Sequence, residues 1–296
     1  MMIALQAATP QLPRTKAVAD QVVAVGETDS TNALAARMIG DGSLTLPECK
    51  GGTLAVGVVA TDWQSAGRGR NGHTWISQPG RCSTMSYAVR IPRAIATDES
   101  VNGWLQMIAG LVTLDALNGM IKEYGAAPNK QDCFLELKWP NDVFCHGLKL
   151  GGLLSELVLL PDGEADDDDV VVVFGVGLNL ALGASRLPTP QSTSLRLHVS
   201  GLPSFNEMRD AVAEREVEGF RERLAAFIAD PHGQAEALRE EMKAVCWARG
   251  RQIEAHFTDG TTLIGEAIGL NEDASLILRT EDGTDHTVRT ADVGVL

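Results

Sequence analysis

Apolar residues recur along this chain with a helical period in some segments and in short unbroken runs in others. Between Trp104 and Tyr124 an apolar side chain returns at every fourth position, which predicts a long helix packed on a sheet. Ser204 and Glu207 have the spacing of a capping box, so a second helix is predicted from there. Pro231 is expected to separate that helix from a third, which ends before residue 250.

A shorter helix is predicted after the Ser30 to Asn32 cluster, with its first turn capped by those hydroxyl groups. The remaining apolar runs are too short and too rich in Val, Leu and Phe for helices, and they predict strands at 54–60, 83–89, 134–139, 152–160 and 170–180. We therefore expect an α+β fold in which helices cover a central sheet.

The last two of these runs flank an acidic segment, Asp166 to Asp169. Spaced acidic residues would indicate a metal site, but unspaced aspartates are more typical of a solvated hairpin tip. Beyond Arg251 apolar and polar residues alternate between two Asp-Gly turn signals, which predicts a small β-barrel. The expected organisation is a tail over 1–21, a main domain over 22–248 and a C-terminal domain over 249–296.

Charge and cysteine content exclude several classes of protein. The 296 residues include 25 basic and 39 acidic side chains, a net charge of −14, which disfavours nucleic-acid binding. The five cysteines form no C-x-x-C pair, so reduced thiols are expected rather than a disulfide framework. No secretory signal is evident at the N-terminus, and no apolar run reaches the roughly 20 residues of a membrane span. A cytoplasmic protein with no membrane contact is expected.

A glycine- and arginine-rich segment follows the first predicted strand of the main domain. Gly67, Gly69 and Gly72 allow backbone N–H groups to approach an anion, and Arg68 and Arg70 add fixed positive charge suited to phosphate. The pattern is neither a P-loop nor a dinucleotide-binding turn, because the stretch from 75 to 89 is predicted as a strand. A mobile surface loop is the alternative.

Three further clusters place polar or glycine residues inside apolar segments. They are Lys138-Trp139-Pro140-Asn141-Asp142, Lys149-Leu150-Gly151-Gly152 and Gly175-Val176-Gly177-Leu178-Asn179. A lysine among apolar neighbours favours an anionic ligand, and glycines within a strand favour close approach of a ligand. Each cluster alone could equally be a structural turn or strand end.

Taken in order, these clusters together with Asp29-Ser30-Thr31-Asn32 and Gly67-Arg68-Gly69-Arg70-x-Gly72 resemble the motifs of the biotin protein ligases. The resemblance runs from about Glu27 to the C-terminus. It implies a class II synthetase-like mixed sheet covered by helices, followed by an SH3-like barrel. It also implies an ATP-dependent enzyme that forms biotinyl-5′-adenylate and transfers biotin to a lysine of a biotin carboxyl carrier protein.

The resemblance assigns roles to individual residues. Biotin would be held by Ser30, Thr31, Asn32, Gln64, Arg68, Gly69, Arg70, Lys149 and Gly152. ATP and the adenylate would contact Arg68, Arg70, Trp75, Lys138, Asn141 and Asn179. Lys149, Arg70 and Asp142 would be catalytic, with Asp142 accepting a proton from the carrier lysine or, alternatively, capping a turn or orienting a metal. Mg²⁺ would enter on the ATP phosphates, with Asn179 as a candidate ligand.

The chain departs from the family pattern at His73, where an arginine is usual. An imidazole gives no constant charge at neutral pH, so a loop whose ordering depends on pH is expected. The roughly 25 residues before the first motif are too few for a DNA-binding helix-turn-helix module, so a monofunctional ligase is expected. Both a monomer and a homodimer fit the family. The alternative functions are a lipoate or octanoate ligase of the same fold and a non-catalytic biotin sensor.

Overall fold

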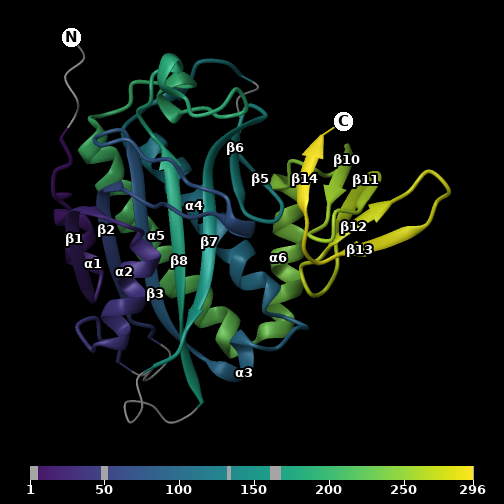
Figure 1. The fold of residues 1–296 in the computed structure, drawn as a ribbon, viewed down its shortest axis with the longest axis horizontal. Helices are drawn as coiled ribbons and strands as arrows, with labels where there is room; N and C mark the ends of the chain where they lie inside the picture. The colour runs from purple at the N-terminus through teal and green to yellow at the C-terminus, as the bar shows by residue number, and fades with distance from the viewer. Residues whose placement is uncertain (1–5, 48–52, 132–134, 161–167, 296) are drawn as a thin grey trace.

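The main layer of the protein is a seven-stranded mixed sheet, seen in a computed structural model that describes residues 6–47, 53–131, 135–160 and 168–295 (Figure 1). Its strands are β1 (Gln21–Thr28), β2 (Val56–Gln64), β3 (Cys82–Pro92), β5 (Leu135–Lys138), β6 (Asp142–Cys145), β7 (Leu148–Val158) and β8 (Asp169–Asn179). Their order is β1-β2-β3-β8-β7-β6-β5. β1 and β2 are parallel, and the other neighbouring strands are antiparallel.

Helices cover both faces of this sheet. On one face α2 (Thr31–Gly40) packs against β2, β3 and β8. On the other lie α4 (Gly103–Glu123), α5 (Phe205–Ala229) and α6 (Pro231–Val245). The short elements are α1 (Pro13–Val18), α3 (Arg93–Ala96), β4 (Ala127–Pro128), β9 (Val199–Ser200) and three 3₁₀ turns at Arg70–Gly72, Ala184–Arg186 and Leu195–Leu197. The predicted α+β fold is confirmed.

Helix α4 is the most apolar helix among the described residues. It is long and apolar enough to cross a membrane, but 72% of its most apolar stretch is buried inside the protein. Trp104, Ile108 and Leu117 on this helix are fully buried against the sheet and α5. The apolar periodicity from Trp104 to Tyr124 is therefore that of a core helix, as predicted.

The helix boundaries agree with the predictions, but one cap differs. The capping box of α5 is present, because Ser204 N donates to Glu207 Oε2 at 3.0 Å and Glu207 N donates to Ser204 Oγ at 3.4 Å. Pro231 starts α6 directly after α5. Ser30 is the N-cap residue of α2, but its hydroxyl makes no capping hydrogen bond. Gln64 of β2 caps this helix instead, a tertiary contact that a local pattern does not indicate.

The predicted strands are present, with different ends. The strand expected from Trp75 begins only at Cys82, because residues 75–81 form a turn and irregular backbone. Strands β1 and β6 were not predicted. Phe134 lies outside the described residues, as do Asp166 and Asp167 of the acidic run. Asp169 starts β8, and its carboxylate is 2.7 Å from Arg90 Nε.

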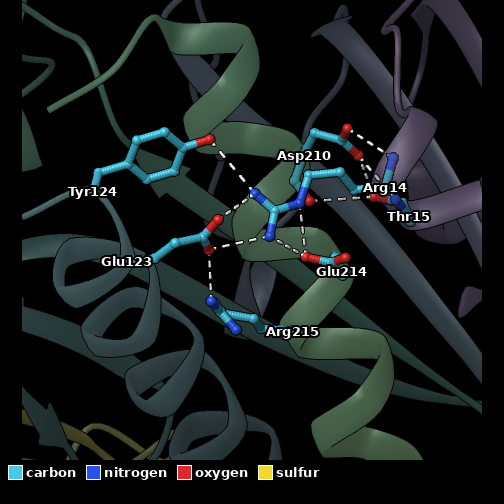
Figure 2. A network of polar contacts seen from close by, with 7 residues as sticks. All are labelled: Arg14, Thr15, Glu123, Tyr124, Asp210, Glu214 and Arg215. Carbon is cyan, nitrogen blue, oxygen red and sulfur yellow. Dashed lines mark hydrogen bonds and ion pairs between the residues drawn. The ribbon is translucent and has the colours of Figure 1, made fainter. Parts of the chain in front are cut away.

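The expectation of an unstructured tail over 1–21 is wrong for the described part of that segment. Residues 13–18 form α1, and the carboxylate of Asp210 on α5 accepts hydrogen bonds from the backbone N–H groups of Arg14 and Thr15. Figure 2 shows the Arg14 guanidinium between Glu123 on α4 and Glu214 on α5. Contacts so distant in sequence leave no local periodicity, which is why the segment looked irregular.

The C-terminal part forms a separate five-stranded antiparallel sheet in the order β13-β12-β11-β10-β14. Its strands are β10 (Gln252–His256), β11 (Thr262–Leu270), β12 (Leu276–Arg279), β13 (Asp285–Val288) and β14 (Asp292–Val295). Two indole N–H groups of the main domain hold it: Trp104 Nε1 donates to Glu272 O at 2.6 Å and Trp139 Nε1 donates to Ala274 O at 2.9 Å. The predicted antiparallel C-terminal strands are confirmed.

A carboxyl group is buried in the core between α5 and the sheet. Glu216 is 2% exposed, its Oε2 accepts a hydrogen bond from the Tyr87 hydroxyl, and its Oε1 has no hydrogen-bond partner among the described residues. Burial raises the pKa of Glu216 to about 7. Because this lies above the pKa of an unfolded glutamate, about 4.3, the folded state binds the proton more tightly.

The free energy of unfolding is therefore expected to fall as the pH rises from about 4.3 through about 7, and to level off above that range. Over this window the wild-type protein should lose on the order of 4 kcal/mol relative to Glu216→Gln, which cannot ionise. Urea unfolding at several pH values measures the difference. The exposed Glu218→Gln on the same helix is the matched control. Parallel profiles for the wild type and Glu216→Gln would contradict the prediction.

Candidate active site

A cavity of about 230 Å³ opens where the seven-stranded sheet meets the C-terminal sheet. It is lined by the start of α2, the end of β2, the loop over residues 68–75, the middle of β3, the β5–β6 turn, and the glycine-containing parts of β7 and β8. Asp292 and Val293 of β14 complete the wall. The fold thus brings together the four motif clusters and the Ser30 to Asn32 segment, which span about half the chain.

One end of the cavity is a network of hydrogen-bonded polar groups. Gln64 Oε1 accepts hydrogen bonds from Thr31 N at 2.8 Å and from Thr31 Oγ1 at 3.2 Å. Ser86 on β3, which is fully buried, has its hydroxyl 2.7 Å from Thr31 Oγ1 and 2.6 Å from Asn32 Oδ1. Asn32 Nδ2 donates to Glu156 Oε2 at 2.7 Å. Mutual hydrogen bonds hold these side chains in one arrangement, as recognition of a polar ligand requires.

The glycine- and arginine-rich segment folds back on itself at the mouth of the cavity. Gly69 N donates to His73 O at 2.7 Å, and Trp75 N donates to Gly67 O at 3.0 Å. A Cβ at Gly67 would lie 2.4 Å from Trp75 O, so only glycine permits this close return of the chain. Arg68 Nη2 lies 3.7 Å from Glu156 Oε1, which ties the base of the loop to β7.

Positive charge gathers at the other end of the cavity. Lys149 Nζ is 2.7 Å from Asp142 Oδ1, and this lysine side chain is 36% exposed. Burial lowers the pKa of Lys138, and the nearby Asp142 acts in the opposite direction. Burial likewise lowers the pKa of Arg70, against the effect of Asp292 and Asp142. Cations that have lost part of their hydration gain most from an anionic ligand, so this end suits a carboxylate or phosphate.

Two glycines of β8 line the cavity and also accommodate side chains of its wall. A Cβ at Gly175 would lie 2.5 Å from Asn32 Oδ1, and a Cβ at Gly177 would lie 2.6 Å from Trp75 Cε2. These positions therefore make room for side chains of the cavity wall, and the predicted close approach of a ligand stays a prediction. The Trp75 ring also lies near Gly152, and its Nε1 has no hydrogen-bond partner among the described residues.

The cavity contains nearly all of the residues singled out from the sequence. The lining includes the predicted residues Ser30, Thr31, Asn32, Gln64, Arg68, Gly69, Arg70, Trp75, Lys138, Asn141, Asp142, Lys149 and Gly152, and also His73. Asn179 is outside it. That side chain is buried, with Nδ2 donating to Thr193 O at 3.0 Å and Oδ1 3.6 Å from Cys82 Sγ. A nucleotide or metal contact by Asn179 would require these contacts to change.

Sequence reasoning missed Ser86, Glu156 and Asp292. Ser86 lies two residues from Thr84 on β3, and Thr84 lines the cavity, so strand alternation was a usable signal for this face of the strand. Glu156 lies near the end of β7, where the residues around it are mostly apolar. Its own segment therefore gave no sign of a role in the site. Asp292 comes from the C-terminal sheet, and no local pattern could place it beside residue 71.

A family model supports the class predicted from the motifs. Residues 48–175 match the model of the biotin/lipoate A/B protein ligase family. The match includes the glycine- and arginine-rich loop and both lysine clusters. The predicted family and enzyme class are confirmed.

Two relatives illustrate the similarity. The chain is 27% identical over 258 residues to the biotin–[acetyl-CoA-carboxylase] ligase of Mycobacterium tuberculosis, which covers 87% of this chain and 83% of the relative. It is 26% identical over 229 residues to the bifunctional ligase/repressor BirA of Bacillus subtilis, covering 76% of this chain and 62% of that protein. The similarity to the first relative extends over most of both chains.

A solved structure has the same fold. The biotin protein ligase of Aquifex aeolicus, solved in complex with biotin and ATP, matches with a TM-score of 0.61 at 20% identity. The match covers 94% of this chain and all of that one.

Proposed function

We propose that the protein is an ATP-dependent biotin ligase that makes biotinyl-5′-adenylate and then transfers biotin to a lysine of a carrier protein. One observation carries the proposal: a single cavity has a hydrogen-bonded polar end around Thr31 and Gln64 and a cationic end around Lys149 and Lys138. Biotin has the matching pair of ends, a polar ureido ring and a carboxylate. The names of the relatives and of the matching structure agree with this substrate.

The cationic end suits the first half-reaction. A carboxylate oxygen of biotin attacks the α-phosphorus of ATP, the bond to the β-phosphate breaks, and pyrophosphate leaves. The reactants are both anions, so Lys149, Arg70 and Lys138 would lower the barrier by offsetting their repulsion and fixing their positions. We assign Lys149 to the biotin carboxylate, and Arg68, Arg70, Lys138 and Asn141 to the phosphates.

In the second half-reaction the amine of a carrier lysine attacks the acyl carbon, and AMP leaves. The amine must lose a proton, and Asp142 is the proposed acceptor because its carboxylate lines the cavity. Its ion pair with Lys149 would have to open first, and the arrival of the biotin carboxylate at Lys149 provides a competing anion for that step.

Magnesium fits this scheme as a companion of the nucleotide. Among the described residues no group of three or more His, Cys, Asp or Glu side chains could hold a metal ion. Mg²⁺ would therefore be bound mainly by the ATP phosphates, where it neutralises charge. We further propose that the carrier is a biotin carboxyl carrier domain of a biotin-dependent carboxylase, and that the protein works in the cytoplasm.

Calorimetric titration with biotin, with and without ATP and Mg²⁺, tests the proposal. A ligase should retain its adenylate at least about 100-fold more tightly than biotin, since the cationic end gains a phosphate. Equal affinity in both titrations would make the protein a biotin binder without catalysis. Tight binding of lipoate or octanoate in place of biotin would assign it to the other branch of the family.

A further inference from the structure

The C-terminal sheet contributes a carboxylate to the cavity. Asp292 is the first residue of β14, and it lines the cavity together with Val293. β14 pairs with β10 along its length, and the sheet is fixed to the main domain by the indoles of Trp104 and Trp139. The backbone that carries Asp292 is therefore held by its pairing with β10, in a sheet that is itself fixed to the main domain.

This carboxylate contacts the apex of the loop over residues 67–75. Asn71 Nδ2 lies 3.2 Å from Asp292 Oδ1 and 3.3 Å from Oδ2. Asn71 and Gly72 are both left-handed, with φ of 51° and 77°, so the chain reverses tightly at the contact. The hairpin hydrogen bonds of the loop join it only to itself. A contact at the apex joins it to a different part of the protein.

Asp292 also lies near the half-buried cations of the cavity. Its charge acts on Arg70 and on Lys138, alongside that of Asp142. A carboxylate beside a phosphate-binding group is unfavourable for anion binding by charge alone. The hydrogen bond to Asn71 gives this carboxylate a structural role in the cavity wall.

We propose that Asp292 is a positioning residue that tethers the apex of the 67–75 loop to the C-terminal sheet. The tether keeps Arg68 and Arg70 at the mouth of the cavity before a ligand arrives. Its catalytic consequence, longer retention of the acyl-adenylate, rests on the proposed function. The tether itself is a property of the ligand-free protein.

Hydrogen exchange of the ligand-free protein, read by mass spectrometry on peptides that cover residues 67–75, tests the tether without catalysis. Asp292→Ala should speed exchange in the loop by about 3- to 10-fold, the range for loss of one hydrogen bond. Asp292→Asn keeps an oxygen acceptor for Asn71, so it should exchange close to the wild-type rate. Glu266→Gln, which removes a charge elsewhere on the same sheet, is the matched control and should change nothing.

Equal acceleration by Asp292→Asn and Asp292→Ala would overturn the proposal, because charge and not the hydrogen bond would then hold the loop. Wild-type rates in Asp292→Ala would overturn it as well. If that variant does not fold, Asn71→Ala must show the same acceleration at residues 73–75. Failure of the protein to form an adenylate would disprove the proposed function and leave the exchange result standing.

Discussion

Replacing Lys149 by methionine is expected to lower the rate of acyl-adenylate formation by about 10²- to 10³-fold, the usual effect of removing one preorganised charge partner from a transition state. The side chain reaches into the cavity to within 2.7 Å of Asp142, and methionine keeps much of its volume without its charge. Single-turnover formation of labelled adenylate from biotin and ATP measures the change.

Lys122→Met is the matched control, because Lys122 is an exposed lysine near the end of α4 and far from the cavity lining. It should react at the wild-type rate. Urea unfolding of both variants separates lost chemistry from lost folding. Adenylate formation by Lys149→Met within threefold of the wild type would remove this lysine from the proposed mechanism.

Gly177→Ala is expected to weaken biotin binding by about 5- to 150-fold, as overpacking of a close-packed wall costs roughly 1 to 3 kcal/mol. The added methyl group would lie 2.6 Å from Trp75 Cε2 and 2.8 Å from Cζ2, so the indole ring must move. Trp75 lines the cavity and also lies near Gly152, so its movement changes the shape of the site. Calorimetric titration with biotin measures the loss.

Gly183→Ala provides the control for this substitution. A Cβ at Gly183 would have no heavy atom within 4 Å apart from its own chain neighbours. The φ angle of Gly183 is −79°, which alanine adopts freely. It should bind biotin as the wild type does. Wild-type affinity for biotin in Gly177→Ala would contradict the prediction, because the Trp75 ring would then move without weakening biotin binding.

The sequence predicted the helices and most strands because their apolar periodicity is local. The stripe from Trp104 to Tyr124 and the Ser204 capping box each depend on neighbours within one or two turns. Helix α1 was missed because its anchoring contact is distant: it is capped by Asp210, nearly 200 residues away in sequence. A single-sequence pattern contains no signal for such a contact.

The same distinction applies to the site. Glycines, arginines and lysines that interrupt apolar runs were visible in the sequence, and the structure gathers them around one cavity. Ser86 and Asp292 looked ordinary in their own segments, and only tertiary packing places them beside Asn32 and Asn71. The sequence also did not show that Asn179 turns away from the cavity toward Thr193.

The central claim is that the cavity activates biotin with ATP. Pyrophosphate–ATP exchange by the purified protein with Mg²⁺, compared for biotin, lipoate and octanoate, tests it most directly. We expect exchange that depends on biotin and is absent with lipoate and octanoate. Exchange with lipoate or octanoate alone, or no exchange with any of the three, would contradict it.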